Sequence, residues 1–271
     1  MIKRAMVLVM GCGALALGCS TEQDAGAPQE VAAVDETPEI IENLVAAGFP
    51  ADDIMVVDGK VYVGRDAEVS LQASREMLQV DASRGAVPEQ YRTSNLVSQN
   101  LAVICINGSA FANISKLSQG LDLAIENYNQ RNLTFRMERR TTGNTAGCGA
   151  TIQARVISGT GGSAGFPSGG LPFNTINIGS GLTQFSTDVV EHVITHELGH
   201  CIGFRHSDFF DRSISCGGAP TNEGSGGVGA IHIPGTPTGA VVGGSLMNSC
   251  FRSTENGEFT NSDITALNAL Y

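Results

Sequence analysis

The spacing of apolar residues predicts small elements in the first ninety residues. Between residues 40 and 45 they recur at helical spacing after a Thr-Pro start, so a helix is expected over 37–47. Two β-rich runs flank an Asp-Gly pair and predict a hairpin over 54–63. A charged stretch near 67–79 predicts a second helix, and residues 82–91 have the composition of a linker.

Longer elements are predicted from about residue 92 onward. Apolar runs predict strands over 101–106, 133–137, 152–156 and 175–178, and helical spacing predicts helices over 117–128, 188–202 and 261–270. The segments 158–170 and 217–245 are rich in glycine and other turn-forming residues, so they are expected to be irregular. We find no internal repeat.

The composition indicates a folded protein with a separate acidic front part. The chain has 271 residues, of which 42% are apolar, and this is enough for a sizeable core. The net charge is −11, and residues 1–90 carry most of it, with 15 Asp/Glu against 6 Lys/Arg. There is no basic stripe, so nucleic acid is not expected as a partner. We therefore expect a tether over 20–34, a small unit over 35–90 and a larger domain over 91–271.

Residues 1–19 have the layout of an export signal. Lys3 and Arg4 form a positive end, and the apolar run from Ala5 to Gly18 is too short to span a membrane. The run leads into Cys19, which resembles the lipidated cysteine of a bacterial lipoprotein box, while Cys12 lies in a rival box. The sequence thus predicts an exported protein, either held in the bacterial cell envelope by an N-terminal lipid anchor or secreted.

Export permits disulfide bonds among the cysteines that follow Cys19. They are Cys105, Cys148, Cys201, Cys216 and Cys250. Cys201 and Cys216 enclose a short loop, so we expect this pair first, and Cys105 with Cys148 next. Because five is an odd number, at least one thiol stays free.

Residues 196–206, HELGHCIGFRH, predict a metal site. His196 and His200 are four residues apart, so on a helix they lie on one face and can bind one ion. Gly203 permits the backbone turn that ends the helix and brings His206 back as a third nitrogen ligand. Three protein ligands leave one tetrahedral position open, which is typical of a catalytic zinc site.

Glu197 is the expected catalytic residue. It follows His196 directly, so it can reach a water molecule on the metal without being a ligand itself. We expect Glu197 to take the proton of this zinc-bound water and pass it to the leaving amine, while Zn²⁺ polarises the scissile carbonyl. His192 and His232 are expected to be surface or packing residues.

The same eleven residues match the extended zinc signature of the metzincin metallopeptidases, which the chain resembles. In metzincins a methionine in a tight turn lies beneath the zinc site, and Met247 in SLMNS lies at a suitable distance. From about residue 37 to its end, the chain is most similar to the bacterial dual-action HEIGH metallopeptidases, a metzincin branch. The motifs AGFPSGG and SCGG add to this resemblance.

The resemblance implies an α+β fold. We expect a metzincin-like (zincin) catalytic domain with a mixed twisted sheet, two long helices and an irregular lower subdomain, preceded by a small helix–hairpin unit. The resemblance also implies that Ala164, Gly165 and Phe166 form an exposed edge strand on which an extended peptide substrate pairs. The alternative is that this segment is a mere glycine-rich connection.

The sequence departs from two related patterns. Astacin-like metzincins carry a tyrosine ligand just after the Met-turn, where this chain has Asn248-Ser249. Matrixin-type latency uses a propeptide cysteine, but residues 20–90 contain none. If residues 35–90 are an inhibitory pro-region rather than a permanent accessory unit, another contact is needed. An acidic side chain is then expected to make it, such as Asp52, Asp53 or Asp58.

Together these features predict a zinc-dependent endopeptidase with one catalytic Zn²⁺ ion. We expect an exported zymogen that acts as a monomer on peptides or proteins and touches a membrane only through its lipid anchor. The alternative is a surface lipoprotein that serves as a binding module and carries a non-catalytic zinc site. A zinc hydrolase of non-peptide amides is a third reading that no feature of the sequence supports.

Overall fold

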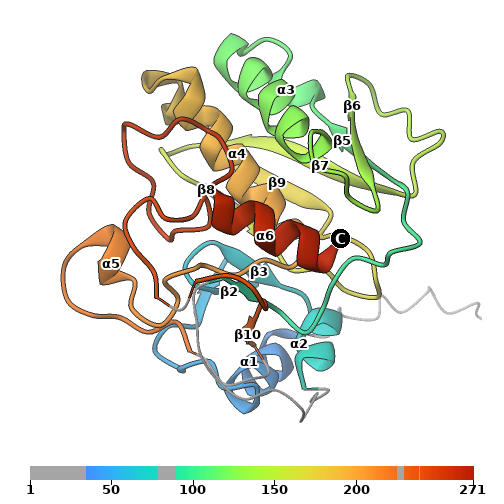
Figure 1. Cartoon of the computed structure of the whole chain (residues 1–271). Coiled ribbons are helices and arrows are strands. Elements are labelled where there is room, and N and C mark those ends of the chain that lie inside the picture. Colours follow the sequence, from blue (N-terminus) through green and yellow to red (C-terminus); the bar gives the residue numbers. More distant parts are fainter. Residues whose placement is uncertain (1–34, 79–89, 225–228, 238) are drawn as a thin grey trace, which may run out of the picture. The chain divides into compact units, whose positions relative to one another are not determined.

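The computed structural model describes residues 35–78, 90–224, 229–237 and 239–271 (Figure 1). The predicted export signal, Cys19 and the tether lie outside these residues, and so does most of the predicted linker. Residues 35–271 form one compact unit, so the small N-terminal part packs with the rest of the chain. Among the described residues, no helix is both long and apolar enough to cross a membrane.

The described residues form both helices and strands. The helices are α1 Thr37–Ala46, α2 Leu71–Met77, α3 Ser115–Asn129, α4 Thr187–Ile202, α5 Ser213–Cys216 and α6 Asn261–Leu270, with 3₁₀ turns η1 Ser109–Phe111 and η2 Ser180–Gln184. The strands are β1 Met55–Val57, β2 Lys60–Val63, β3 Ala67–Val69, β4 Tyr91–Arg92, β5 Val103–Asn107, β6 Arg136–Arg140, β7 Ala150–Ile157, β8 Gly162–Gly165, β9 Thr175–Gly179 and β10 Ile231–His232.

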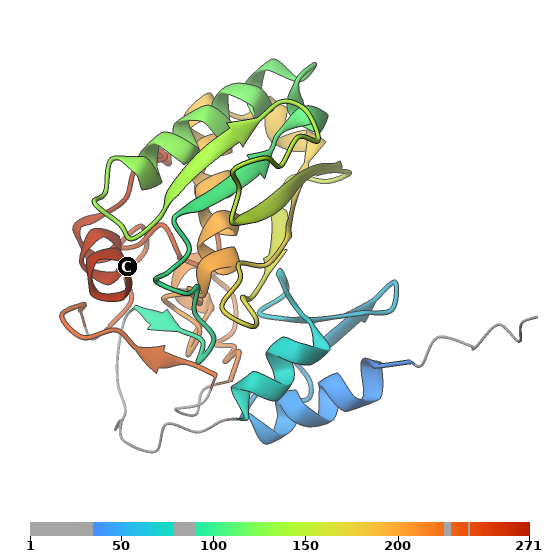
Figure 2. The same cartoon turned by 90° about the vertical axis from the view of Figure 1, so that its right-hand side faces the viewer.

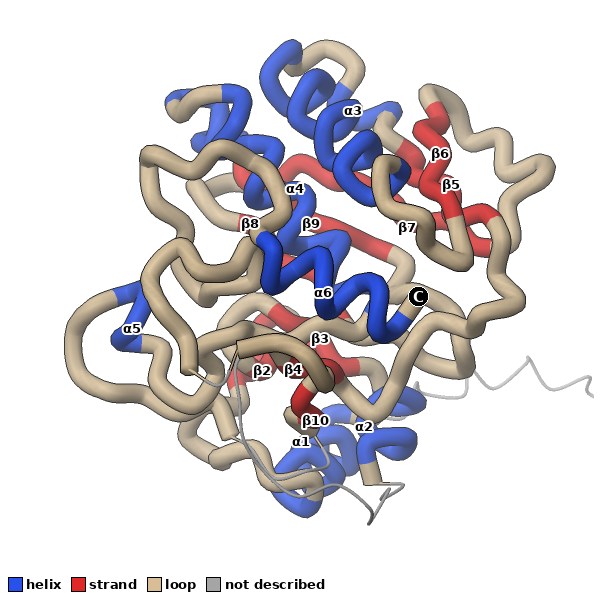
Figure 3. The backbone as a smooth tube through the Cα atoms, in the orientation of Figure 1, coloured by secondary structure: helices blue, strands red, loops and turns tan. Residues whose placement is uncertain are grey.

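The main sheet has the strand order β1-β2-β3-β8-β9-β7-β5-β6. Figure 3 draws the strands in red and labels all of them except β1. Strands β6, β5, β7 and β9 are parallel to one another, while β8 is antiparallel to β9. The first three strands form an antiparallel meander, and β3 joins it to β8 in parallel. The sheet is therefore mixed, as expected for the α+β class, and the N-terminal unit extends the sheet of the larger domain.

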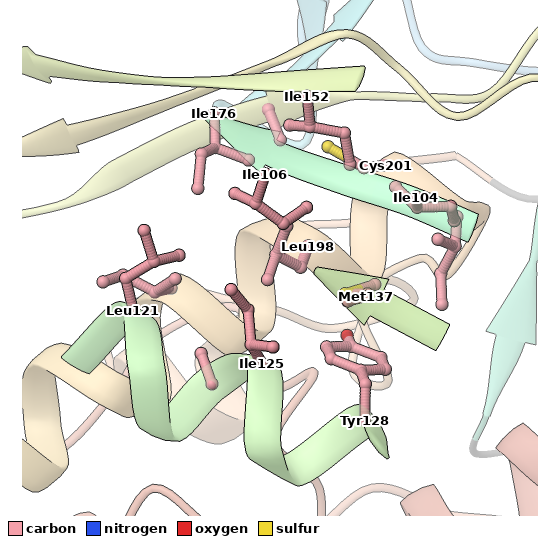
Figure 4. Packing of buried hydrophobic residues seen from close by; sticks show 14 of the residues in the cluster. Ile104, Ile106, Leu121, Ile125, Tyr128, Met137, Ile152, Ile176, Leu198 and Cys201 are labelled. Carbon is pink, nitrogen blue, oxygen red and sulfur yellow. The ribbon is translucent and has the colours of Figure 1, made fainter. Parts of the chain in front are cut away.

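The main core lies between the sheet and two long helices. Figures 1 and 2 show α3 and α4 side by side along the strands β5, β7 and β9. Figure 4 shows how isoleucines from the strands meet leucine, isoleucine and tyrosine side chains from the helices. Gly120 of α3 allows the close approach of the two helices, because a Cβ there would lie 3.1 Å from the backbone nitrogen of Glu191. The expectation of two long helices is therefore confirmed by α3 and α4.

The N-terminal unit departs from its predicted elements at one point that matters for the site. The helix over 37–47 and the hairpin over 54–63 are confirmed as α1 and as β1 with β2. The charged stretch near 67–79 is only partly helical, because Ala67 and Val69 alternate inward and form β3 before Ser70 caps α2. A three-residue strand leaves too short a pattern for sequence analysis to separate it from the helix that follows.

The disulfide bonds correct one expectation. Cys105 pairs with Cys148, as expected second, but Cys216 pairs with Cys250. The expected Cys201–Cys216 bond is wrong, because Cys201 is free and fully buried in α4. Its sulfur points toward the carbonyl oxygen of Thr175 in β9, at 3.8 Å, so it belongs to the core rather than to the loop that carries Cys216.

Candidate metal centre

Helix α4 carries two of the three predicted metal-binding histidines. Ser186 caps its start by accepting a hydrogen bond from the backbone nitrogen of Val189, at 3.2 Å. Every residue from Val189 to Ile202 is buried, so the helix runs through the interior. Gly203 ends it with φ +114°, and a Cβ there would lie 2.7 Å from the carbonyl oxygen of Asn95. Only glycine fits this turn, which redirects the chain toward His206.

The three histidines lie together, with ring centroids 4.7 to 5.1 Å apart. Each ring is held through its Nδ1 atom, and the partners of His196, His200 and His206 are the carbonyl oxygen of Leu246 (3.0 Å), the carbonyl oxygen of Phe204 (2.8 Å) and the carboxylate of Glu223 (2.8 Å). An acceptor at Nδ1 places the ring proton there and leaves Nε2 as a ligand atom. The Nε2 atoms of His196 and His206 are 3.2 Å apart.

Asp66 brings a carboxylate to the same point. It directly precedes β3, and its oxygens lie 3.2 Å from Nε2 of His206, 3.7 Å from Nε2 of His200 and 4.0 Å from Nε2 of His196. Sequence analysis missed Asp66, since no spacing links it to the histidines. Of the acids considered there, Asp53 accepts a hydrogen bond from the backbone nitrogen of Gly64, at 3.2 Å. The acid of the N-terminal unit that lies beside the histidines is Asp66, in the turn after β2, rather than Asp52, Asp53 or Asp58, which were given as examples.

The donor set fits a divalent metal ion. The four candidate ligand atoms all lie within 4.8 Å of one another, and the distances from the Asp66 oxygens to the three Nε2 atoms are 3.2 to 4.0 Å. Nitrogen or oxygen atoms about 2.0 Å from one tetrahedral centre would be roughly 3.3 Å apart, so small side-chain shifts would bring the group around one ion. Within the described part of the chain, Nε2 of His200 and Oδ1 of Asp66 are buried without a hydrogen-bond partner. Unpaired buried polar atoms are costly, and a shared cation satisfies both.

Burial lowers the pKa values of the three histidines, whereas neighbouring carboxylates raise them. Burial lowers the pKa of His196 to about 4 and that of His200 to about 3, and the neighbouring imidazoles act in the same direction. Burial acts likewise on His206, but the carboxylates of Asp66 and Glu223 outweigh it and raise the pKa of His206 to about 10. Metal binding at this site therefore competes with protons chiefly at His206.

Glu197 faces a pocket beside the histidines. Its side chain is buried, and Oε2 has no hydrogen-bond partner among the described residues. Burial raises the pKa of Glu197 well above its usual value, and the charge of Asp66 adds to this. The pocket has a volume of about 200 Å³. Its lining includes Asp66, His196 and Glu197, together with Gly161, Gly162, His192, Val193, Asn248, Ser249, Cys250 and Phe251.

Of the other residues considered in the sequence analysis, Met247 supports the metal site, whereas His192 and His232 are not candidate ligands. The turn with Met247 supports it, since Leu246 accepts the hydrogen bond of His196 and the Met247 sulfur would lie 2.6 Å from a Cβ on Gly199. His192 is buried and lines the pocket, whereas His232 lies in β10 and donates to or accepts from Thr236 at 2.9 Å. Neither belongs to the metal-ligand group.

The expected edge strand is present but covered. Ala164 and Gly165 belong to β8, and Phe166 follows directly. All three are buried, because β3 pairs with β8 on the side away from β9. The expectation of an exposed edge is therefore wrong for this chain as folded, and the covering strand comes from the N-terminal unit that also supplies Asp66.

Three imidazoles on a helix and its following turn, with the Asp66 carboxylate close to them and Glu197 in the adjoining pocket, form a candidate metal site consistent with a metallopeptidase. The profile of the "Dual-action HEIGH metallo-peptidase" family matches residues 61–271, so the chain belongs to this family of hydrolases. A comparison with curated proteins gives no match.

Two solved structures of myroilysin are similar to parts of the chain. One has 18% identity and a TM-score of 0.28, covering 39% of this chain and 44% of that chain. The other has 13% identity and a TM-score of 0.38, covering 65% of this chain and 95% of that chain. The first match thus spans less than half of the myroilysin chain.

Proposed function

We propose that the chain is an exported zinc-dependent endopeptidase whose general base is Glu197. The observation that carries this proposal is the convergence of three imidazole Nε2 atoms beside the buried Glu197, whose Oε2 has no hydrogen-bond partner among the described residues. A Zn²⁺ ion, when bound, polarises a carbonyl oxygen and makes water a stronger acid. The family supports the same class of reaction.

The roles of this chain's own residues follow from their positions. His196, His200 and His206 would hold the ion and would leave Glu197 free to exchange protons. Glu197 takes one proton from the attacking water as its oxygen bonds to the scissile carbon, and returns it to the nitrogen as the C–N bond breaks. Burial favours the protonated form of Glu197, so the carboxylate is a strong acceptor in this step.

The N-terminal unit, residues 35–78, is proposed to keep this site latent. Strand β3 pairs with β8 in the register Ala67↔Ala164 and Glu68↔Gly165, on the edge that the family resemblance assigns to substrate. The backbone nitrogen of Ala164 donates to the carbonyl oxygen of Asp66 at 3.0 Å. Asp66 and the adjoining strand β3 thus cover the proposed substrate edge with backbone, and the Asp66 carboxylate would serve as a further ligand of the ion.

Asp66→Ala tests latency in the full chain. The variant removes the fourth carboxylate, so we expect casein cleavage to rise at least about tenfold above that of the wild type. Adding Glu68→Pro removes a backbone N–H from β3 and should raise cleavage further. Asp52→Ala is the matched control, because Asp52 is exposed in the same unit. Wild-type chain that is already fully active, or a folded, zinc-loaded double variant that stays inactive, contradicts the latency proposal.

Glu197→Gln, introduced into the Asp66→Ala chain, tests the general base. Glutamine has the same shape but cannot take a proton, so cleavage should fall about 10²- to 10⁴-fold while zinc stays bound. Casein digestion and metal analysis of the same sample give both quantities. Retained cleavage would refute the role of Glu197, and absence of bound zinc would refute the metal site.

Export and lipidation rest on separate support. The bonds Cys105–Cys148 and Cys216–Cys250 suit an oxidising compartment outside the cytoplasm. Lipidation of Cys19 remains a proposal from the sequence alone. The mass of the N-terminal peptide of mature protein distinguishes a lipidated cysteine, plain secretion and removal of the N-terminal unit.

One observation favours the alternative of a non-catalytic zinc site. With Asp66 in place the site offers four protein ligands, and closed four-ligand sites are typical of structural zinc. A permanent accessory unit that binds a partner would keep this arrangement. Stoichiometric zinc without any cleavage in the Asp66→Ala, Glu68→Pro chain is the outcome that this alternative requires.

A further inference from the structure

The third histidine differs from the other two in how it is held. His196 and His200 lie on α4, whose backbone fixes both positions, and their Nδ1 atoms meet neutral carbonyl oxygens. His206 lies beyond the end of the helix, in no regular element. Its Nδ1 atom lies 2.8 Å from Oε1 of Glu223, a carboxylate. A ligand on an irregular segment needs an anchor that the helix does not provide.

Glu223 is built into the interior as such an anchor. It is 1% exposed, and its backbone nitrogen donates to the carbonyl oxygen of Phe209 at 2.8 Å. Arg212 donates to the same oxygen that meets His206, and Ser249 donates to it at 3.2 Å. Arg205 donates to the other oxygen at 3.4 Å. Two guanidinium groups keep a buried carboxylate ionised, and an ionised carboxylate can only accept hydrogen bonds.

The two arginines are themselves fixed by other parts of the chain. Arg205 donates to the carbonyl oxygens of Gly224 (3.1 Å) and Gly229 (2.9 Å), and its guanidinium lies 4.6 Å from the ring centroid of Phe49. Arg212 donates to the carbonyl oxygen of Gly64 at 2.7 Å. Since both arginines are restrained, Glu223 cannot turn away from His206 without leaving two buried charges unpaired.

We propose that Glu223 is the positioning residue of the metal centre: its carboxylate holds the Nδ1–H of His206 and so directs Nε2 of that ring toward the ion. This inference rests on the proposed zinc site, but not on its catalytic activity. A carboxylate on the outer nitrogen of a ligating histidine fixes the tautomer and raises the basicity of the ring. Of the three ligands, His206 alone has this kind of support in the described structure.

The test measures zinc affinity in the full chain by competition with a chromophoric chelator. Glu223→Gln keeps the size of the side chain but loses its charge, so we expect Zn²⁺ affinity to fall about 10- to 100-fold. Glu191→Gln is the matched control, because Glu191 is also buried, lies on α4 and accepts a hydrogen bond from Asn127 rather than from one of the three candidate ligands. Its Zn²⁺ affinity should equal that of the wild type.

The absorption spectrum of bound Co²⁺ provides a second measurement, which would stay unchanged if Glu223 only stabilised the fold. At saturating Co²⁺, the visible ligand-field bands of Glu223→Gln should differ from those of the wild type, while those of Glu191→Gln should not. If Glu223→Gln fails to fold, Glu223→Asp takes its place, because it keeps the charge that both arginines need and shortens the side chain by one methylene. A smaller loss of Zn²⁺ affinity is then expected, still at least about threefold.

Folded Glu223 variants with wild-type Zn²⁺ affinity and Co²⁺ bands overturn the proposal. An equal loss of affinity in Glu191→Gln does so as well, since it assigns the effect to the loss of any buried carboxylate. A wild-type chain that binds no Zn²⁺ overturns the proposed function itself. These outcomes are therefore distinguishable in one set of titrations.

Discussion

Gly162 leaves room for the Glu197 side chain because it has no side chain of its own. A Cβ built on this residue would lie 2.7 Å from Cγ of Glu197, which is closer than real Cβ contacts come. Glu197 lies inside α4 and cannot shift its backbone. The Glu197 carboxylate therefore fits in its place only because β8 has a glycine at position 162.

Gly162→Ala should displace the Glu197 side chain and leave the metal ligands unchanged. We expect casein cleavage by the Asp66→Ala chain to fall about 10²-fold, within the range for loss of a general base, at unchanged zinc stoichiometry. Gly161→Ala is the matched control, since a Cβ there meets no atom within 4 Å. Equal rates in both variants would show that Glu197 is not displaced.

Among the residues of the candidate site, those that lie close together in the sequence on one helix could be predicted. His196, Glu197 and His200 were predictable because helical geometry converts a four-residue spacing into a shared face. Asp66 and Glu223 were not, because each arrives from a separate segment and only the folded backbone brings it to the histidines. A local motif predicts the candidate ligands on one helix, but it cannot predict residues that other segments of the chain bring to the site.

Helix α4 contains a second buried carboxylate, at Glu191. Burial raises the pKa of Glu191 to about 7 from the usual value of 4.5, and Glu258 and Asp188 add repulsion, although the hydrogen bond from Asn127 acts in the opposite direction. The folded chain thus keeps a proton on Glu191 that the unfolded chain releases above about pH 4.5. This difference makes the wild type less stable as the pH rises from about 4.5 to 7.

Glu191→Gln removes this titration and keeps an acceptor for Asn127. The free energy of unfolding of the variant, relative to that of the wild type, should rise between pH 4.5 and 7 and level off above about 7. Urea unfolding at several pH values measures the difference. A stability difference that is constant with pH would contradict the assignment.

Elements were predictable where the sequence carries a long periodic pattern or a specific turn signal. The long helices α3 and α4 and the Asp-Gly hairpin follow from patterns that extend over many residues. Strand β3 has three residues and β8 four, of which two are glycine, so neither carries a usable alternation. Their pairing is set by tertiary contacts, and this pairing decides whether the edge of the sheet is open.

At the scale of the whole molecule, the metal centre joins the N-terminal unit to the larger domain. Asp66 belongs to the first and the three histidines to the second, and they surround one point. An ion bound there stabilises only the folded chain, since the ligands are scattered in the unfolded one.

Chelation of the full chain should therefore lower its melting temperature. Zinc at a thousandfold excess over its dissociation constant contributes about 4 kcal/mol, and this stabilisation is lost when the metal is removed. Differential scanning calorimetry with and without chelator measures the shift, and added Zn²⁺ should reverse it. His200→Ala provides the control, because a chain that lacks one ligand should melt at a temperature that depends little on the chelator.

Strands β3 and β8 are segments of a single polypeptide, and this has a consequence for how their pairing responds to concentration. A separate inhibitor dissociates when a protein is diluted after export, but an intramolecular partner keeps the same effective concentration at any dilution. Neither dilution nor competition by modest amounts of peptide can uncover β8 for long. A backbone cut after β3 and before Cys105 turns the pair into two molecules that can diffuse apart, whereas a cut between Cys105 and Cys148 leaves them joined by the disulfide bond.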